Sequence, residues 1–182
     1  MPGKPKSPLT AQPLLADNQT AAFAELLRPH FRVLEVGSGG STLWLARRVA
    51  LVETIEPDRD WARVLRAAIA KRELTNIRIH EVARTQMGAH VARIGGQWDL
   101  IYVDGVKEQR AIAIRNGASL VVPGGHLIAD DYNSKINVKP AIDALGAEWE
   151  VTIITGQKKN PLGRGMVTTQ MAICHRRKLQ SA

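Results

Sequence analysis

The sequence predicts an α/β protein built on one doubly wound sheet that is mostly parallel and ends in one antiparallel C-terminal strand. Two observations carry this prediction. Short apolar runs alternate with helical stretches along most of the 182 residues, which is the pattern of a parallel sheet covered on both faces. The last two apolar runs are joined by GQKKNPLGRG, a loop without a helical pattern, so they must be antiparallel neighbours, because parallel strands need a crossover.

Three strand–helix units are predicted in the first half of the chain. The first apolar run ends in a glycine cluster, and the amphipathic residues after it favour a helix. The second helix has a start signal, because Asp58 is a residue type whose side chain caps a first helical turn. The predicted elements are strand 31–36, helix 41–49, strand 51–56, helix 59–71, strand 76–80 and a weaker helix 85–93.

The second half continues the alternation before the helix-free ending. We expect Gly117 to close one helix and Gly146 to end the next, since glycine often follows the last residue of a helix. The turn residues Pro123, Gly124 and Gly125 are expected to precede a strand. The predicted elements are strand 98–103, helix 108–116, strand 126–129, helix 138–145, and strands 150–155 and 167–175.

The composition indicates one cytoplasmic domain. A chain of 182 residues with 45% hydrophobic residues has the size and apolar content of a single core. No apolar run is long enough to cross a membrane, MPGKPKSPLTAQP lacks the apolar stretch of a signal peptide, and the lone Cys174 cannot form an internal disulfide. We expect a flexible N-terminal arm over residues 1–17, a single domain over 18–178 and no membrane partner.

Positive charge gathers at the C-terminal end. The net charge is +8, and no Asp or Glu follows residue 150. We favour a solvated loop and tail, because the run lacks the interleaved aromatic residues that bind single strands. Nucleic acid or another anionic partner is the alternative. The basic residues are Lys158, Lys159, Arg164, Arg176, Arg177 and Lys178.

The glycine turn in LEVGSGGSTLWLA indicates a ligand close to the backbone. Gly37, Gly39 and Gly40 lie between the first strand and helix, where bare backbone N–H groups suit an anion. The dinucleotide fingerprint is met only in part, because Thr42 takes its sixth place, and no Lys follows as in a phosphate loop. Glu35 would repel a pyrophosphate and suits a ligand with an amino or sulfonium charge.

Two later strand ends suit the rest of an adenosyl ligand. Glu56 ends the second strand, where an acid can accept both hydroxyls of a ribose, in NAD as in other adenosyl ligands. A solvent-facing acid before a helix cap is the alternative for Glu56. The adenine is expected in an apolar slot after the third strand, near Val82 and Ala83, with Glu81 as the acid beside it.

Three carboxylates follow the fourth and fifth strands. Asp104 comes after one apolar strand with Lys107 three residues on, and Asp130 and Asp131 end the next. Neighbouring parallel strands end at the same edge of a sheet, so these carboxylates can converge beside the ligand. Such oxygen ligands suit Mg²⁺ or Ca²⁺. In the alternative, Asp131 caps a turn and Asp130 faces water.

Four segments in this order resemble the motifs of class I S-adenosylmethionine-dependent methyltransferases, from about Gln19 to the final strand. They are LEVGSGGSTLWLA, VETIEPDRDWA, WDLIYVDG and LVVPGGHLIADD. The resemblance implies a Rossmann-like fold and S-adenosylmethionine (SAM) as cofactor. The implied cofactor-binding residues are Glu35, Gly37, Ser38, Gly39, Ser41, Thr42, Glu56, Pro57, Glu81, Val82, Ala83 and Asp104.

Within that class, VDGVKEQR followed by PGGHLIADDYN is similar to the catechol O-methyltransferase-like branch. By that resemblance Asp104 and Asp130 are metal ligands, Asp131 takes the usual place of an Asn, and Lys107 is the general base. Arg110 stands where that branch often has an aromatic residue. If no metal binds, we expect Lys107 to pair with Asp104.

The function expected from these motifs is methyl transfer to an oxygen of a small-molecule acceptor, assisted by a divalent metal, with Lys107 and Asp104 as catalytic residues. One alternative is a nucleic-acid (RNA) methyltransferase, suggested by the basic C-terminus. Another is a non-catalytic or NAD-binding module. The basic loop 156–165 and the N-terminal arm are the candidates to cover a substrate, unless a partner subunit of a homo-oligomer does so.

Overall fold

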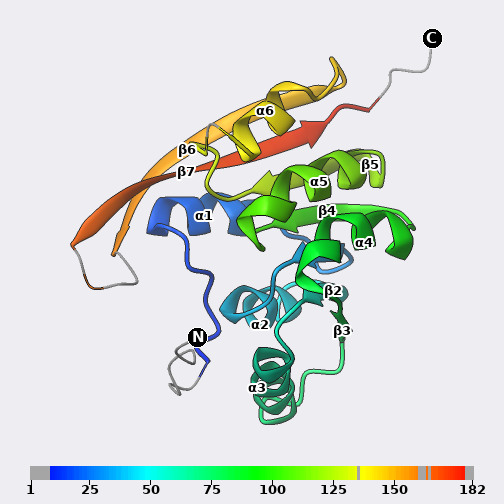
Figure 1. Ribbon diagram of the computed structural model, residues 1–182, viewed down its shortest axis with the longest axis vertical. Helices are drawn as coiled ribbons and strands as arrows, with labels where there is room; N and C mark the ends of the chain where they lie inside the picture. The colour runs from blue at the N-terminus through cyan, green and yellow to red at the C-terminus, as the bar shows by residue number, and fades with distance from the viewer. Residues whose placement is uncertain (1–8, 135, 160–162, 164, 179–182) are drawn as a thin grey trace.

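The computed structural model of the chain describes residues 9–134, 136–159, 163 and 165–178 (Figure 1). In this part of the chain, seven strands form one sheet in the order β3-β2-β1-β4-β5-β7-β6. The strands are β1 (Arg32–Val36), β2 (Leu51–Glu56), β3 (Ile77–Glu81), β4 (Trp98–Val103), β5 (Val121–Ala129), β6 (Trp149–Lys159) and β7 (Met166–Arg176). The helices are α1 (Asp17–Leu26), α2 (Gly40–Ala46), α3 (Arg59–Ala70), α4 (Met87–Ile94), α5 (Lys107–Ala118) and α6 (Val138–Asp143), with a 3₁₀ turn η1 (Arg84–Gln86).

The predicted fold class is confirmed. The strands β3, β2, β1, β4 and β5 pair in parallel, whereas β7 runs antiparallel to both β5 and β6. The bounds of β2 and β4 agree with the predicted strands, and Asp58 caps α3 by accepting hydrogen bonds from the backbone N–H groups of Asp60 and Trp61. No helix among the described residues is long and apolar enough to span a bilayer.

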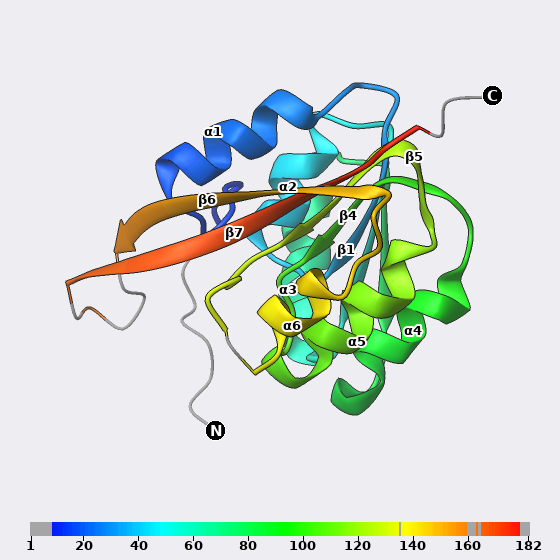
Figure 2. The same cartoon turned by 90° about the horizontal axis from the view of Figure 1, so that it is seen from above.

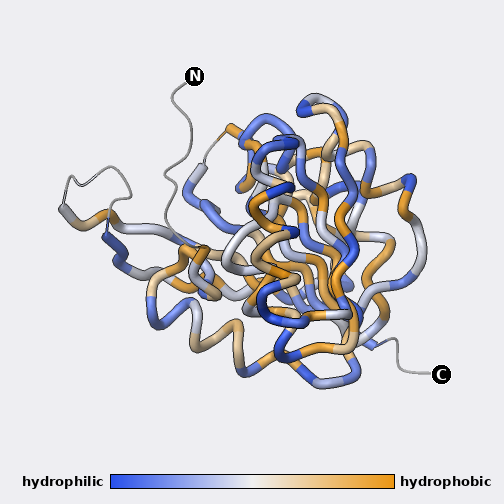
Figure 3. The backbone as a smooth tube through the Cα atoms, turned by 90° about the horizontal axis from the view of Figure 1, so that it is seen from below, coloured by the Kyte–Doolittle hydropathy of each residue, from blue (hydrophilic) through white to orange (hydrophobic). Residues whose placement is uncertain are grey.

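The sheet is buried on both faces, and alternate residues of each central strand enter different clusters. In β1, Leu34 packs with α4, α5 and α6, while Val33 packs with α1 and α2 on the opposite face. Both side chains are fully buried, and each such burial contributes about 1.5–3 kcal/mol. Figure 2 shows helices on both sides of the strands, and Figure 3 shows hydrophobic stretches along the central strands.

The glycines of the second half have other roles than the predicted ones. Gly117 lies inside α5, where a Cβ would approach the Ile101 side chain at 3.2 Å, so it allows α5 to pack closely on β4. Gly124 and Gly125 lie inside β5, at a register shift opposite β4. These two glycines form a strand irregularity and not a preceding turn. The next helix, α6, ends at Asp143, before the predicted Gly146.

The sequence pattern did not predict α1, whose Phe23 is fully buried against the rings of Trp44 and Tyr102, at centroid distances of 5.3 and 5.1 Å. Residues 9–17 are the described part of the predicted arm 1–17, whereas residues 1–8 lie outside the described residues. Asp17 already begins α1, and residues 9–16 are called here the N-terminal segment. Leu15 and Ala16 in this segment are buried. The segment therefore packs against the domain before α1 begins.

The last two strands are longer than predicted and project beyond the sheet. Only His126–Ala129 of β5 pairs with β7, whereas β6 and β7 pair with each other over their whole lengths. Residues 154–159 and 166–171, called here the ribbon, therefore extend past the carboxyl end of β5 (Figures 1 and 2). Gly156 allows α1 to lie against the ribbon, because a Cβ there would meet the Cβ of Ala16 at 2.5 Å.

Candidate functional site

The glycine turn lies between β1 and α2 at the carboxyl edge of the sheet. Gly37 has a φ of 97°, in the left-handed region that favours glycine. A Cβ on Gly37 would also come within 2.7 Å of the Cα of Gly105, in the turn after β4. At Gly40, a Cβ would meet the carbonyl oxygens of Thr10 and Gln12 at 2.5 and 2.2 Å. The turn is therefore in close contact with the turn after β4 and with the N-terminal segment.

Glu35 lies beneath this turn and is fully buried. The hydroxyls of Ser41 and Thr42 donate to its two carboxylate oxygens at 2.5 and 2.6 Å, and the N–H of Gly39 donates to Thr42 at 2.9 Å. Burial raises the pKa of Glu35 to about 7, although these hydroxyl hydrogen bonds lower it. Glu35 therefore stabilises the conformation of the turn. The sequence suggested that its carboxylate faces a cationic ligand, but in the structure both carboxylate oxygens are buried and bonded to the turn.

Glu56 stands beside the turn at the end of β2. One carboxylate oxygen accepts a hydrogen bond from the Ser38 hydroxyl at 2.5 Å, and the other accepts one from the Asp58 N–H at 2.9 Å. The Trp61 indole N–H donates to the Ser38 carbonyl at 3.0 Å. The structure thus brings together Glu56 and the turn residue Ser38, two of the predicted cofactor residues, and Pro57 follows directly in the chain.

The predicted cofactor residues Glu81, Val82 and Ala83 lie at the end of β3, next to β2 in the sheet. Glu81 is the register partner of Glu56, and its carboxylate pairs with Arg66 of α3 at 2.5 Å. The Val82 N–H donates to the Glu56 carbonyl at 3.2 Å, and Ala83 precedes η1. The ends of β1, β2 and β3 therefore form one continuous edge.

The three carboxylates of the second half converge as the strand order predicted. Val103 pairs with Ala129, so Asp104 after β4 lies beside Asp130 after β5. The Asp104 N–H donates to the Val36 carbonyl at 3.0 Å, which fixes Asp104 next to the glycine turn. The carboxylates therefore stand directly beside the glycine turn.

Arg110 lies at the centre of these carboxylates. Its guanidinium pairs with Asp104 at 2.9 Å and with Asp131 at 2.8 Å, and its Nε donates to the Gly105 carbonyl at 2.8 Å. Only 8% of the Arg110 side chain is exposed. The sequence showed Arg110 only as a departure from an aromatic position, and no local pattern indicated that it would bind two carboxylates.

Lys158 of the ribbon contributes a second cation. Its ammonium lies 3.4 Å from the Asp130 carboxylate and donates to the Leu14 carbonyl at 2.6 Å. The other Asp130 oxygen is buried and has no hydrogen-bond partner among the described residues. Sequence analysis placed Lys158 only in a basic run. The basic loop and the N-terminal arm, both expected to cover a substrate, thus meet at Lys158.

Two carboxylates of this cluster, Asp104 and Asp130, have pKa values above that of an ordinary aspartate. Burial and the neighbouring Asp130 charge raise the pKa of Asp104 to about 7, against the opposing effect of Arg110. Burial likewise raises the pKa of Asp130. The Tyr102 hydroxyl donates to Asp104 at 3.3 Å. Asp104 is therefore suited to exchange a proton near neutral pH.

A divalent cation does not fit the cluster in this arrangement. Asp104 and Asp131 both face the Arg110 guanidinium, and Asp130 faces Lys158. In the described part of the chain, no group of three or more His, Cys, Asp or Glu residues is placed to hold a metal ion. A metal here would lie beside protein cations of like charge. The carboxylates predicted as metal ligands are instead the ion-pair partners of Arg110 and Lys158.

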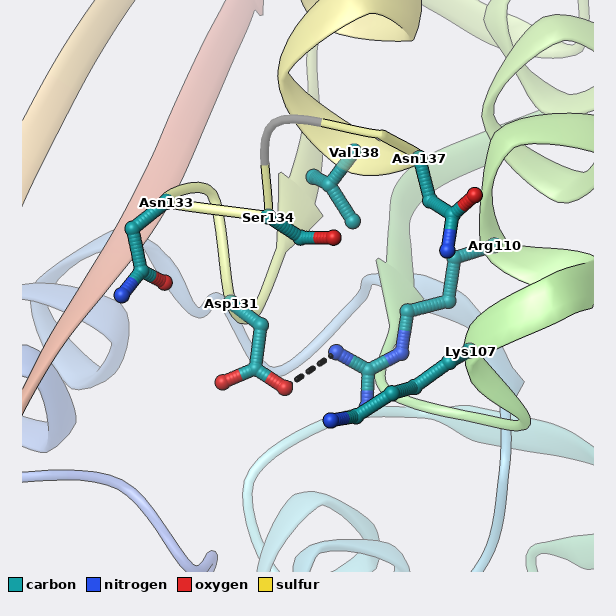
Figure 4. A pocket seen from close by; sticks show the side chains of 7 residues that line it. All are labelled: Lys107, Arg110, Asp131, Asn133, Ser134, Asn137 and Val138. Atoms are coloured by element: carbon teal, nitrogen blue, oxygen red, sulfur yellow. Dashed lines mark hydrogen bonds and ion pairs between the residues drawn. The ribbon is translucent and has the colours of Figure 1, made fainter.

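Lys107 does not form the salt bridge with Asp104 that was expected for a metal-free site, because Arg110 takes that place. Lys107 is the first residue of α5 and is exposed. It lines a pocket of about 260 Å³ beside the cluster (Figure 4). The lining residues are Lys107, Arg110, Asp131, Asn133, Ser134, Asn137 and Val138.

No family model and no curated protein matches the sequence, but solved methyltransferase structures do match the fold. An O-methyltransferase from Bacillus cereus in complex with SAH (S-adenosylhomocysteine) is 18% identical with a TM-score of 0.67, over 87% of this chain and 81% of that one. An O-methyltransferase of tomaymycin synthesis from Streptomyces achromogenes, in complex with SAM, is 20% identical with a TM-score of 0.66, over 88% and 81%. An rRNA methylase from Streptococcus thermophilus is 12% identical with a TM-score of 0.65, over 91% and 100%.

The chain has the Rossmann-like α/β fold of these methyltransferases. At such identities the likeness concerns the fold, which small-molecule and RNA enzymes share. The reaction must therefore be inferred from the residues at the carboxyl ends of the parallel strands, an edge of the sheet called here the carboxyl edge.

Proposed function

We propose that this chain is a SAM-dependent methyltransferase that methylates an oxygen of a small-molecule acceptor. The observation that carries the proposal is the contact between Glu56 and the glycine turn, whose Ser38 hydroxyl donates to Glu56 at 2.5 Å. An adenosyl ligand can exchange this hydrogen bond for its ribose hydroxyls and lay its amino-acid end over the turn. A pyrophosphate is disfavoured, because the Glu35 carboxylate lies directly beneath the same turn.

The solved structures of similar fold support this ligand class. The Bacillus cereus O-methyltransferase was determined with SAH and the Streptomyces achromogenes O-methyltransferase with SAM. Open α/β sheets bind their ligands outside the carboxyl ends of the strands. In this chain that edge holds the glycine turn and the carboxylate cluster side by side, because Asp104 is hydrogen-bonded to the end of β1.

The reaction proposed is an in-line displacement. The acceptor oxygen forms a bond to the methyl carbon, the carbon–sulfur bond breaks, and its electron pair stays on sulfur to give SAH. The protein supplies mainly position, and good orientation of two reactants contributes about 7–11 kcal/mol to such a step. The acceptor approaches from the β4 and β5 ends, where Asp104 and the pocket lie.

Asp104 is the better candidate for the residue that takes the acceptor proton. Its pKa of about 7 places it near the optimum for a general base at neutral pH. Lys107, by contrast, is exposed, and Arg110 takes the place beside Asp104. Arg110 and Lys158 hold the neighbouring carboxylates, so this mechanism requires no metal.

The basic C-terminal run offers less support for an RNA substrate than its charge suggests. Lys158 is directed at Asp130, and Arg176 donates to the carbonyl oxygens of Ser119 and Val121. These cations are therefore partly committed to contacts within the protein. A small-molecule acceptor is the substrate class that we propose on this ground.

Methyl transfer from radiolabelled SAM tests the proposal. The acceptors are a panel of small phenols, catechols and hydroxy acids, and bulk RNA, each with and without EDTA. We expect label on a small hydroxylated acceptor, unchanged by EDTA, and loss of transfer in Asp104→Asn. Label on RNA alone, abolished by high salt, would replace the small-molecule assignment. Loss of activity with EDTA that Mg²⁺ restores would contradict the metal-free mechanism.

A further inference from the structure

The pocket beside the carboxylate cluster is polar and carries excess positive charge. Its walls come from the start of α5 and from the segment between β5 and α6 (Figure 4). Among its described lining residues, two are cations, Lys107 and Arg110, one is an anion, Asp131, and one, Val138, is hydrophobic. The pocket is therefore suited to a charged or strongly polar group.

The two cations differ in how they are neutralised. Arg110 forms ion pairs with both Asp104 and Asp131, so its charge is balanced within the cluster. Lys107 lies beside Arg110 in Figure 4 and forms no ion pair with any described residue. Among the described lining residues, Lys107 is thus the cation that no ion pair within the protein holds.

The neighbouring groups add hydrogen-bond donors and a favourable dipole. The Ser134 hydroxyl and the side-chain amides of Asn133 and Asn137 line the pocket, and each can donate to an oxygen. Lys107 is also the first residue of α5, a helix of 12 residues, whose N-terminus carries a partial positive charge. Donors and positive potential together favour an anion with oxygen atoms.

We propose, on the basis of the methyltransferase function proposed above, that this pocket binds an anionic group of the methyl acceptor through Lys107 and Ser134. The acceptor is then a small hydroxylated carboxylic acid or phosphate ester. The hydroxyl of the acceptor extends from the pocket toward Asp104. Arg110 lies between the two, because it lines the pocket and also pairs with Asp104. A volume of about 260 Å³ is below the ~300–1,000 Å³ of typical ligand pockets, which suits the charged end of a small acceptor. Lys107 is a residue for substrate binding and not the general base.

Titration of the ¹⁵N-labelled chain of 182 residues with inorganic phosphate and with acetate tests this site. Backbone resonances of Lys107, Ser134 and Asn137 report on the pocket. We expect saturable shifts at these residues with at least one anion, a loss of affinity of fivefold or more in Lys107→Gln, and retained affinity in Lys107→Arg. Lys71→Gln removes the same charge from an exposed lysine at the end of α3 and is expected to behave as wild type.

The outcomes separate the anion classes and the two proposals. Phosphate binding alone indicates a phosphate ester and acetate binding alone a carboxylic acid, and either result supports the site. Shifts that do not saturate, or equal affinities in Lys107→Gln and Lys71→Gln, overturn it. SAH titration of the same samples reports separately on the cofactor edge: SAH binding without anion binding rejects only the pocket, and anion binding without SAH binding rejects the proposed methyltransferase.

Discussion

The two halves of the carboxyl edge are held together in different ways. At the ends of β1 and β2, the polar contacts join residues at most 18 positions apart: Ser41 and Thr42 lie six and seven residues from Glu35, and Ser38 lies 18 from Glu56. At the ends of β4 and β5, Arg110 joins Asp104, six residues away, to Asp131, 21 residues away, and Lys158 lies 28 residues from Asp130 and 144 from Leu14. The proposed cofactor half is therefore built by hydrogen bonds over short stretches of chain, whereas the proposed acceptor half is held by ion pairs that join more distant segments.

The largest loss in the free energy of unfolding is expected from Arg110→Met, which removes the central cation of the acceptor half. It leaves the Asp104 and Asp131 side chains, which are 28% and 34% exposed, without their shared cation. Removing one partner of a fully buried ion pair destabilises a protein by about 3–5 kcal/mol, and the solvent at these two carboxylates lowers the expected loss to about 1.5–3 kcal/mol. Urea denaturation measures this loss. Arg84→Met removes an exposed pair with Glu108 and should change stability by less than about 1 kcal/mol; equal losses in the two variants would contradict the central role of Arg110.

Glu35→Gln tests the cofactor half through the pH dependence of the free energy of unfolding. Because the folded-state pKa of Glu35 is about 7 and its ordinary value is 4.5, the folded protein holds a proton that the unfolded chain releases between these values. This carboxyl therefore makes the free energy of unfolding fall as pH rises from 4.5 to 7, by at most about 1.4 kcal/mol per pH unit. Glu35→Gln should flatten that decline in denaturation curves, whereas the exposed Glu25→Gln should not; a slope identical to that of wild type would show that Glu35 is ionised in the fold.

Gly37→Ala tests whether the turn depends on its backbone conformation. The left-handed φ of 97° and the 2.7 Å approach to Gly105 predict a loss of about 1–3 kcal/mol in stability. Gly39→Ala is the matched variant, because its φ is extended and its Cβ would meet only the Trp61 ring at 3.9 Å. Thermal denaturation should separate the two variants, and equal melting temperatures would refute the argument from close approach.

Lys158→Met should change global stability little, because its 3.4 Å pair with Asp130 is longer than the Arg110 pairs and because Asp130, whose pKa is raised by burial, can take up a proton when the ammonium is removed. We expect hydrogen exchange of the N-terminal segment to rise severalfold while exchange in the glycine turn stays as in wild type. Lys159→Met, at the exposed neighbour, is the control. Unchanged exchange at Leu15 and Ala16 would mean that Lys158 does not hold this segment in place.

The same contrast explains how much the sequence could predict. The fold, the cap at Asp58 and the meeting of Glu56 with the glycine turn follow from patterns in the sequence, because apolar runs, glycines and strand-end acids mark where each strand ends. The ion pairs of Arg110 and Lys158 depend on which distant segments meet, and a basic residue in a helix or loop carries no signal of that. The metal site was predicted from carboxylates alone, without the cations that face them in the fold.

Helix α1 and the glycines of the second half were missed for related reasons. The first residues of α1 are polar or small, and Phe23 gains its contacts only when α2 and β4 are in place. In the sequence, Gly117 has the residue type and position of a glycine that ends a helix. In the structure it lies inside α5, because the Ile101 side chain of the sheet leaves little room for a Cβ there. Such positions are set by tertiary packing and not by the pattern of neighbouring residues.

Calorimetric titration with SAH and with NAD tests whether the glycine turn and Glu56 form a SAM site. We expect the wild-type protein to bind SAH and not NAD. In Glu56→Gln, SAH affinity should fall about ten- to hundredfold, because a hydrogen bond to a charged group contributes about 1.5–3 kcal/mol. Glu150→Gln, at an exposed position in β6, should bind SAH as wild type does. Tight NAD binding without SAH binding, or equal SAH affinity in Glu56→Gln and Glu150→Gln, would contradict the account.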